Sequence, residues 1–196
     1  RESQTRLWIR GGFPPSFLSE SDSASALWRE NFIRTYLERD IPLLGPRVPA
    51  ETLRRFWSML AHAQGSLLNA ASFARSLAVD GKTVAKYLDL MVDLLLVRRL
   101  PPFHANVRKR LVKSPKTYVR DSGLLHQLLG IGSLKELVTH PKVGASWEGF
   151  VIEQVLMMEA HDEAFFWATH QGAEIDLVLR RGDRLFGVEC KRTDTP

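Results

Sequence analysis

Residues 174–191 read EIDLVLRRGDRLFGVECK, and this stretch decides how the C-terminal part of the chain is interpreted. Apolar and polar residues alternate on both sides of Gly182-Asp183, which is the pattern of two antiparallel strands joined by a two-residue turn. In that hairpin Leu177 pairs with Val188, and the apolar residues of both strands share one buried face. A register shifted by one residue would bring Glu189 into the apolar face, so the unshifted register is favoured.

The charged residues of this hairpin gather on its other face. Asp176 comes opposite Glu189, and Glu174 comes opposite Lys191. Opposed side chains have Cβ atoms about 5 Å apart, and two carboxylates at that distance repel each other unless a cation or a proton lies between them. Magnesium binds one or two carboxylates and keeps water ligands. The hairpin therefore predicts a Mg²⁺ or Mn²⁺ site at Asp176 and Glu189, with Lys191 placed to assist an attacking water.

A helix predicted over 146–159 supplies a third acid. Glu148 lies in its first turn, in line with Ile152 on the face expected to pack on the sheet. Taken singly, these residues have structural readings: a cross-strand ion pair, solvated acids on an open face, or a favourable first-turn residue. Taken together, their order predicts an active site. The predicted catalytic residues are Asp176, Glu189, Lys191 and Glu148, and the predicted metal ligands are Asp176, Glu189 and Glu148.

Basic residues are concentrated in one segment of a chain whose net charge is +5. Residues 98–120 contain no Asp or Glu. The basic residues of this segment are Arg98, Arg99, Arg108, Lys109, Arg110, Lys113, Lys116 and Arg120. Such a block favours a polyanionic partner, DNA first and RNA as a second choice. The alternative is a solvated hairpin that keeps the protein soluble.

Helices are predicted upstream of this block, over 25–39, 50–64, 71–77 and 82–95. The last two, joined at Asp80-Gly81, follow the helix-turn-helix pattern, with 98–100 and 116–120 as the strands of a wing. Lys82 and Lys86 would face a nucleic-acid groove. Contacts to the nucleic-acid backbone are expected from Arg108, Lys109, Arg110, Lys113 and Lys116. The alternative is that the winged helix serves only packing or dimer contacts.

Several classes of protein are disfavoured by the rest of the sequence. A single cysteine, Cys190, rules out an internal disulfide and fits a cytoplasmic location, and its side chain is expected in the core. No apolar run of about 18 residues predicts a membrane span. The chain lacks a G-x-x-x-x-G-K-[ST] motif, so it should not hydrolyse ATP by itself. Because it begins at Arg1 and stops five residues after Lys191, we expect a fragment. A homo-oligomer is left open.

Short motifs make the chain similar to the C-terminal half of prokaryotic AAA-type predicted ATPases, which ends in a domain of unassigned function. They are GGFP at 11–14, YLERD at 36–40, TVAKYL at 83–88, KSPK at 113–116, RDSGLLH at 120–126, GASWEG at 144–149, GAEIDL at 172–177 and ECK at 189–191. The resemblance spans nearly the whole chain. It implies an α+β fold in which 1–23 link to a missing P-loop ATPase domain. Residues 24–135 would form a helical winged-helix domain, and 136–196 a restriction-endonuclease-like PD-(D/E)xK domain without its closing helix and strand.

By the same likeness Asp176, Glu189 and Lys191 match the nuclease motif, Glu148 is the helix acid, and Ile175 replaces the usual proline. We therefore expect a nucleic-acid-binding module with a metal-dependent, nuclease-like domain, with phosphodiester hydrolysis as its reaction if it is active, and ATP used only by the missing domain. The alternative is a non-catalytic winged-helix module that binds DNA or a protein, with a relic nuclease fold.

Overall fold

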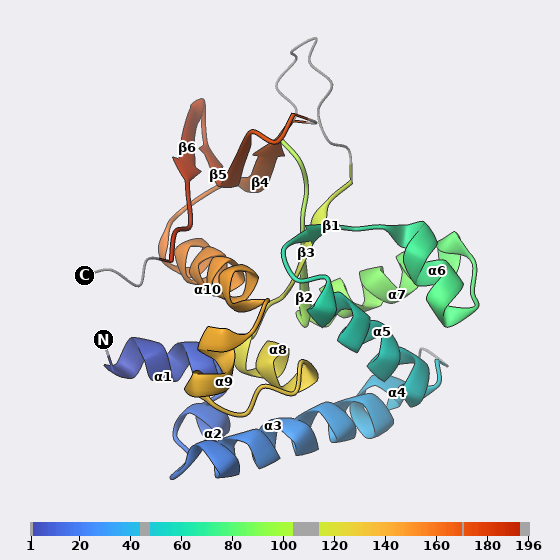
Figure 1. Ribbon diagram of the computed structural model, residues 1–196. Coiled ribbons are helices and arrows are strands. Elements are labelled where there is room, and N and C mark those ends of the chain that lie inside the picture. The colour runs from blue at the N-terminus through green and yellow to red at the C-terminus, as the bar shows by residue number, and fades with distance from the viewer. Residues whose placement is uncertain (1, 44–47, 104–113, 170, 193–196) are drawn as a thin grey trace.

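The computed structural model describes residues 2–43, 48–103, 114–169 and 171–192. The fold is α+β, with two three-stranded antiparallel sheets among helices (Figure 1). The helices are α1 (Glu2–Arg10), α2 (Pro14–Phe17), α3 (Asp22–Thr35), the π-helix η1 (Tyr36–Asp40), α4 (Ile41–Leu43), α5 (Ala50–His62), α6 (Ala70–Leu77), α7 (Gly81–Asp93), α8 (Ser122–Leu128), α9 (Leu134–Thr139) and α10 (Val143–Met158). The strands are β1 (Ser66–Leu67), β2 (Val97–Leu100), β3 (Lys116–Val119), β4 (Glu163–Ala168), β5 (Glu174–Arg181) and β6 (Arg184–Val188).

Helices α5–α7 and strands β2 and β3 share one hydrophobic core. Phe56 and Trp57 of α5 and Val84 and Leu88 of α7 are completely or almost completely buried in it. Asn69 and Asp80 cap α6 and α7 by accepting backbone N–H groups. Strand β3 lies between β1 and β2. The helices predicted over 50–64, 71–77 and 82–95 and the strands predicted at 98–100 and 116–120 are therefore confirmed, whereas β1 was not predicted.

Two stretches for which the sequence predicts no helix are helical. Residues 2–23 contain α1 and α2, and Trp8 and Ile9 are buried against Leu137 and Phe150. Gly11 and Gly12 lie between these two helices, and Pro14 and Pro15 begin α2. Helix α9 lies in the stretch before α10, with Ser133 as its N-cap.

The second sheet has the strand order β4-β5-β6, and α10 covers one of its faces (Figure 1). Leu177 pairs with Val188 and Leu179 with Phe186, which confirms the predicted register. Leu177 and Leu179 are buried against Ile152 of α10, but Phe186 is 48% exposed, so this face is not wholly buried. Leu100 and Tyr118 of the first sheet belong to the same cluster.

A β-bulge in β5 changes which side chains point to α10. Phe165 pairs with Val178 and Trp167 with Ile175, so two residues of β5 lie opposite Phe166 alone. Beyond the bulge the alternation is reversed, and Ile175 shares a cavity on the outer face with Val178 and Trp167. The expectation that Ile175 lies on the buried face with Leu177 is therefore wrong.

Candidate functional site

Acidic residues from α10 and β5 meet a lysine and a tyrosine from β3. Lys116 Nζ lies 3.1 Å from Glu148 Oε1 and also forms an ion pair with Glu174. The Tyr118 hydroxyl donates to the same Glu148 oxygen at 2.6 Å. We call Glu148, Glu174, Asp176, Lys116 and Tyr118 the acid cluster. It joins the first sheet to the second.

Close approach of α10 to β3 brings Glu148 into this position. A Cβ atom on Gly149 would lie 2.4 Å from Gln64 Nε2 and 3.1 Å from Tyr118 Cδ1, so only glycine fits there without a shift. Gln64 is itself fixed, because its Oε1 accepts the Val119 backbone N–H at 2.8 Å. Because α10 begins at Val143, Glu148 lies in its second turn and not in the first. The predicted support from the helix dipole is therefore weaker than expected.

Asp176 joins the cluster because of the bulge. Its Oδ2 accepts the backbone N–H of Cys190 at 2.8 Å, which ties β5 to the chain just after β6. Burial raises the pKa of the Cys190 thiol to about 12, with Asp176 as the next cause, so this cysteine stays protonated. The thiol packs against the core below the second sheet, as predicted.

The acid cluster contains three carboxyl groups and one ammonium ion, so its carboxylates outnumber its cation. Burial raises the pKa of Glu148 and the nearby Asp176 adds to this, although Lys116 and the Tyr118 hydrogen bond act against it. Burial lowers the pKa of Lys116, but Glu148 and Glu174 outweigh it, so the lysine remains an ammonium ion. Burial and Glu148 raise the pKa of Tyr118, which keeps its proton. The cluster thus holds a buried ammonium ion among carboxylates.

The structure separates the four predicted catalytic residues only in part, because Asp176 also contributes to the raised pKa of Lys191, after the hydrogen bond and charge of Glu189. Glu148 and Asp176 belong to the acid cluster. Glu189 and Lys191 follow β6 and bind each other at 2.6 Å, with side chains 47% and 74% exposed. The expected opposition of Asp176 and Glu189 across one face is not present, because β6 ends at Val188 and the bulge turns Asp176 toward α10.

A divalent cation does not fit these residues as they lie. Carboxylate oxygens suit Mg²⁺ or Mn²⁺, but the Lys116 ammonium contacts two of the acids, and Glu189 is directed elsewhere. Within the described ranges, no three His, Cys, Asp or Glu side chains are grouped closely enough to hold a metal ion. We derive no metal-dependent step from this arrangement.

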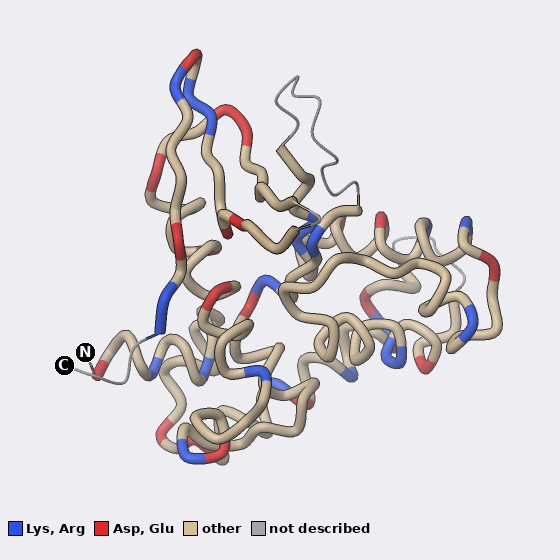
Figure 2. The backbone as a smooth tube through the Cα atoms, turned by 45° about the horizontal axis from the view of Figure 1, so that its top comes forward, with Lys and Arg blue, Asp and Glu red and all other residues tan. Residues whose placement is uncertain are grey.

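The four residues of the basic block that the structure describes, Arg98, Arg99, Lys116 and Arg120, all form ion pairs. Glu153 of α10 binds both Arg98 and Arg120, and Arg99 binds Asp89 at 2.6 Å. Figure 2 shows acidic and basic positions interspersed along the described backbone. The predicted surface position of Lys116 is wrong, because its side chain is 8% exposed. The remaining predicted contacts, Arg108, Lys109, Arg110 and Lys113, lie outside the described residues.

Lys82 and Lys86 keep the exposed positions expected of them. Both lie in the first half of α7, on the side opposite the buried Val84 and Leu88. The Asp80 carboxylate accepts the Thr83 backbone N–H at 2.6 Å and fixes the start of this helix. Asp89 and Asp93 are also exposed, one and two turns further along the helix.

Two family models match successive stretches of the chain. Residues 1–135 match the family model described as Domain of unknown function (DUF8612), and residues 143–196 match Domain of unknown function (DUF4143). The chain is 52% identical, over 191 residues or 97% of its length, to uncharacterized proteins Rv2008c of Mycobacterium tuberculosis and Mb2031c of Mycobacterium bovis. The chain covers 43% of the length of each of these relatives. No solved structure matches the chain. No helix in the described part is long and apolar enough to cross a membrane.

Proposed function

For a chain that belongs to the DUF8612 family and continues into a DUF4143 segment, we propose nucleic-acid binding through a winged helix formed by α5–α7 and the first sheet. One observation carries the proposal: α7 exposes Lys82 and Lys86 at its N-terminal end, and its other face is buried. The order of three helices and a sheet with β3 between β1 and β2 supports the winged-helix assignment.

Contact with the phosphate backbone is the proposed mode of binding. Two exposed lysines one turn apart can each neutralise a phosphate. Asp89 and Asp93 limit how far α7 can enter a groove, because their charges repel phosphate. We therefore propose weak sequence preference, with DNA as the first partner and RNA as the second.

The acid cluster has a structural role in this proposal. Lys116 forms ion pairs with Glu148 and Glu174, and it connects the proposed DNA-binding part to a C-terminal unit that we propose to be a PD-(D/E)xK-like fold. This corresponds to a non-catalytic module with a relic nuclease fold. A cytoplasmic location fits the single, half-buried free thiol of Cys190.

The test is binding of a fluorescein-labelled DNA duplex of about 20 base pairs, followed by fluorescence anisotropy at several salt concentrations. Each lysine that contacts a phosphate contributes about one unit to the slope of log K against log salt. The Lys82→Ala/Lys86→Ala variant should lose roughly two units of slope and at least tenfold in affinity at low salt. Lys135→Ala, an exposed lysine on α9, is the matched control. Wild-type affinity and slope in the double variant would refute the proposal.

Metal-dependent phosphodiester hydrolysis is the second candidate function. It is favoured by the closeness of Glu148 and Asp176, since Asp176 contributes to the raised pKa of Glu148. It requires that Lys116 leave the acids. Incubation of labelled DNA with the chain and Mg²⁺ or Mn²⁺ tests it. Cleavage that Asp176→Ala abolishes would support this candidate, and cleavage that persists in the variant would rule out the acid cluster as its source.

A further inference from the structure

Strand β6 is one edge of the second sheet, and no strand of the described residues pairs with its free side (Figure 1). The opposite edge is covered, because residues 101–103 run beside β4. The Phe166 carbonyl accepts the Phe103 backbone N–H at 2.6 Å, and the Phe166 N–H donates to the Pro101 carbonyl at 3.0 Å. Proline also limits further pairing on that side, since it has no N–H. Strand β6 contains neither a proline nor a bulge.

The turn before β6 determines which of its backbone groups face outward. Arg181 pairs with Arg184 across the two-residue turn, so these two residues exchange both of their backbone hydrogen bonds. Hydrogen-bonded and non-hydrogen-bonded pairs then alternate, so the N–H and C=O groups of Leu185 and Gly187 point away from β5. Among the described residues these outward groups have no hydrogen-bond partner. They form a template for one more strand.

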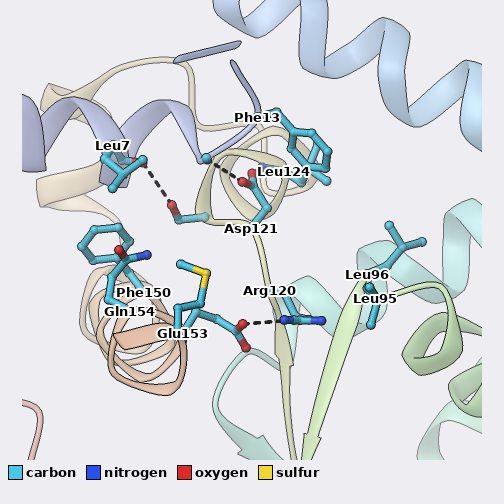
Figure 3. A pocket seen from close by; sticks show the side chains of 13 residues that line it. Leu7, Phe13, Leu95, Leu96, Arg120, Asp121, Leu124, Phe150, Glu153 and Gln154 are labelled. Atoms are coloured by element: carbon cyan, nitrogen blue, oxygen red, sulfur yellow. Dashed lines mark hydrogen bonds and ion pairs between the residues drawn. The ribbon is translucent and has the colours of Figure 1, made fainter. Parts of the chain in front are cut away.

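The side chains of this edge are apolar on both faces of the sheet. Phe186 pairs with the buried Leu179 on the side of α10 and is 48% exposed, whereas Leu185 lines the cavity on the outer face and is 51% exposed. Helix α10 is not free to shift over Phe186, because Glu153 binds Arg120 just after β3 (Figure 3). A layer on one face would cover only one of the two exposed side chains. A neighbouring strand would cover both, because its side chains alternate between the same two faces.

We propose that β6 pairs with β6 of a second copy of this chain, antiparallel and centred on Phe186, so that two three-stranded sheets join into one. This register pairs Leu185 of each copy with Gly187 of the other, so the outward groups of both strands are all used. A shift by two residues in either direction would leave those of Leu185 or of Gly187 outside the strand pair. The register also places the large Leu185 side chain opposite a glycine, and the two Phe186 rings side by side on the other face.

Charges at the two ends of β6 favour a second copy in this orientation. Arg184 begins the strand and Glu189 follows its end, so antiparallel pairing brings each arginine near the acid of the other copy. Parallel pairing would bring the two arginines together. Glu189 already binds Lys191, but its side chain is 47% exposed and can accept a second cation. Because one strand pair buries less than about 1,200 Å² of total surface, the dimer should be weak and reversible.

Sedimentation velocity of the 196-residue chain, from about 2 to about 200 µM, tests the association. The wild type should show a reversible monomer–dimer equilibrium. Leu185→Lys should weaken it at least tenfold, because a lysine on an edge strand opposes pairing. Leu18→Lys is the matched control, since Leu18 is 69% exposed at the end of α2 and lies outside the sheet. A monomer at the highest concentration, or equal losses in the two variants, would overturn the proposal and leave the edge to a strand of another polypeptide.

The register is tested by a disulfide between copies. Cys190→Ser removes the only cysteine, and Phe186→Cys in that background places one thiol of each copy at the symmetry axis. Residues of a central, non-hydrogen-bonded pair have Cα atoms about 4.5 Å apart, within reach of a disulfide. With oxidised glutathione as the oxidant, this variant should form a covalent dimer at least fivefold faster than Arg184→Cys in the same background. Equal rates, or a faster Arg184→Cys, would overturn the pairing centred on Phe186.

Discussion

Replacing Lys116 by methionine removes the ammonium ion from the acid cluster and keeps most of the side-chain volume. The lysine side chain is 8% exposed and its partner Glu148 is 19% exposed, so the pair is largely buried. Breaking a buried pair from one side costs about 3–5 kcal/mol. The Glu174 contribution is small, because that side chain is 40% exposed and water screens it. Glu148 also keeps its Tyr118 hydrogen bond. We therefore expect a loss of about 2–3 kcal/mol at pH 7.

The measurement is urea unfolding followed by tryptophan fluorescence, with the change in unfolding free energy compared between variants. Lys135→Met, on the exposed side of α9, should change stability by less than about 0.5 kcal/mol. Adding Glu148→Gln to Lys116→Met should restore at least half of the loss, because the uncompensated carboxylate is then gone.

The pH dependence has a definite sign. Without Lys116, the pKa of Glu148 rises further above its unfolded value, so the folded variant binds a proton that the unfolded chain does not. The destabilisation of Lys116→Met should therefore shrink as the pH falls from 7 toward 5. A loss below about 1 kcal/mol at pH 7, or a double variant no more stable than the single one, would refute the role of Lys116 as the buried counter-ion of these acids.

Three further predictions concern the packing of α1, α8 and α10. Burial lowers the pKa of His126 to about 4, below its unfolded value near 6.5, so the free energy of unfolding should fall by about 2–3 kcal/mol between pH 7 and 4.5. In thermal unfolding, the stability of His126→Gln should depend less on pH over this range. Gly11→Ala should cost more than about 2 kcal/mol in urea unfolding, since φ is 80° and a Cβ would lie 2.2 Å from Asp121 Oδ1. Gly144→Ala, in a helical position with open space around it, should stabilise by up to about 1 kcal/mol, and a destabilised variant would contradict the helix bounds.

Much of the fold follows from local patterns. The turn at Gly182-Asp183 and the pairing of Leu177 with Val188 depend only on alternation and turn chemistry, and both are confirmed. The helix N-caps at Asn69 and Asp80 also depend only on residues that are close in sequence. The short helix α1 was not predicted, because the glycines and prolines that follow it at 11–15 have the composition of a linker.

The candidate site was harder to predict, because long-range packing determines it. The pairing of Lys116 with Glu148 spans 32 positions, so the partner of this lysine cannot be read from the residues beside it. The bulge opposite Phe166 reverses the alternation that the acid prediction used, so Glu174 and Asp176 face α10. A clue was the run KTYV at 116–119, in which an uncharged, strand-forming sequence follows one lysine.

The apolar cluster beneath the second sheet has an evolutionary consequence. Leu100 and Tyr118 come from the stretch that matches one family model, whereas Ile152, Phe166 and Leu177 come from the stretch that matches the other. Genetic shuffling at the junction near residue 140 would therefore divide one core between two proteins. It would also leave Lys116 without its partners Glu148 and Glu174. Lineages that exchange the C-terminal unit should have to exchange β2 and β3 with it, so the inherited unit extends beyond the stretch that matches DUF4143.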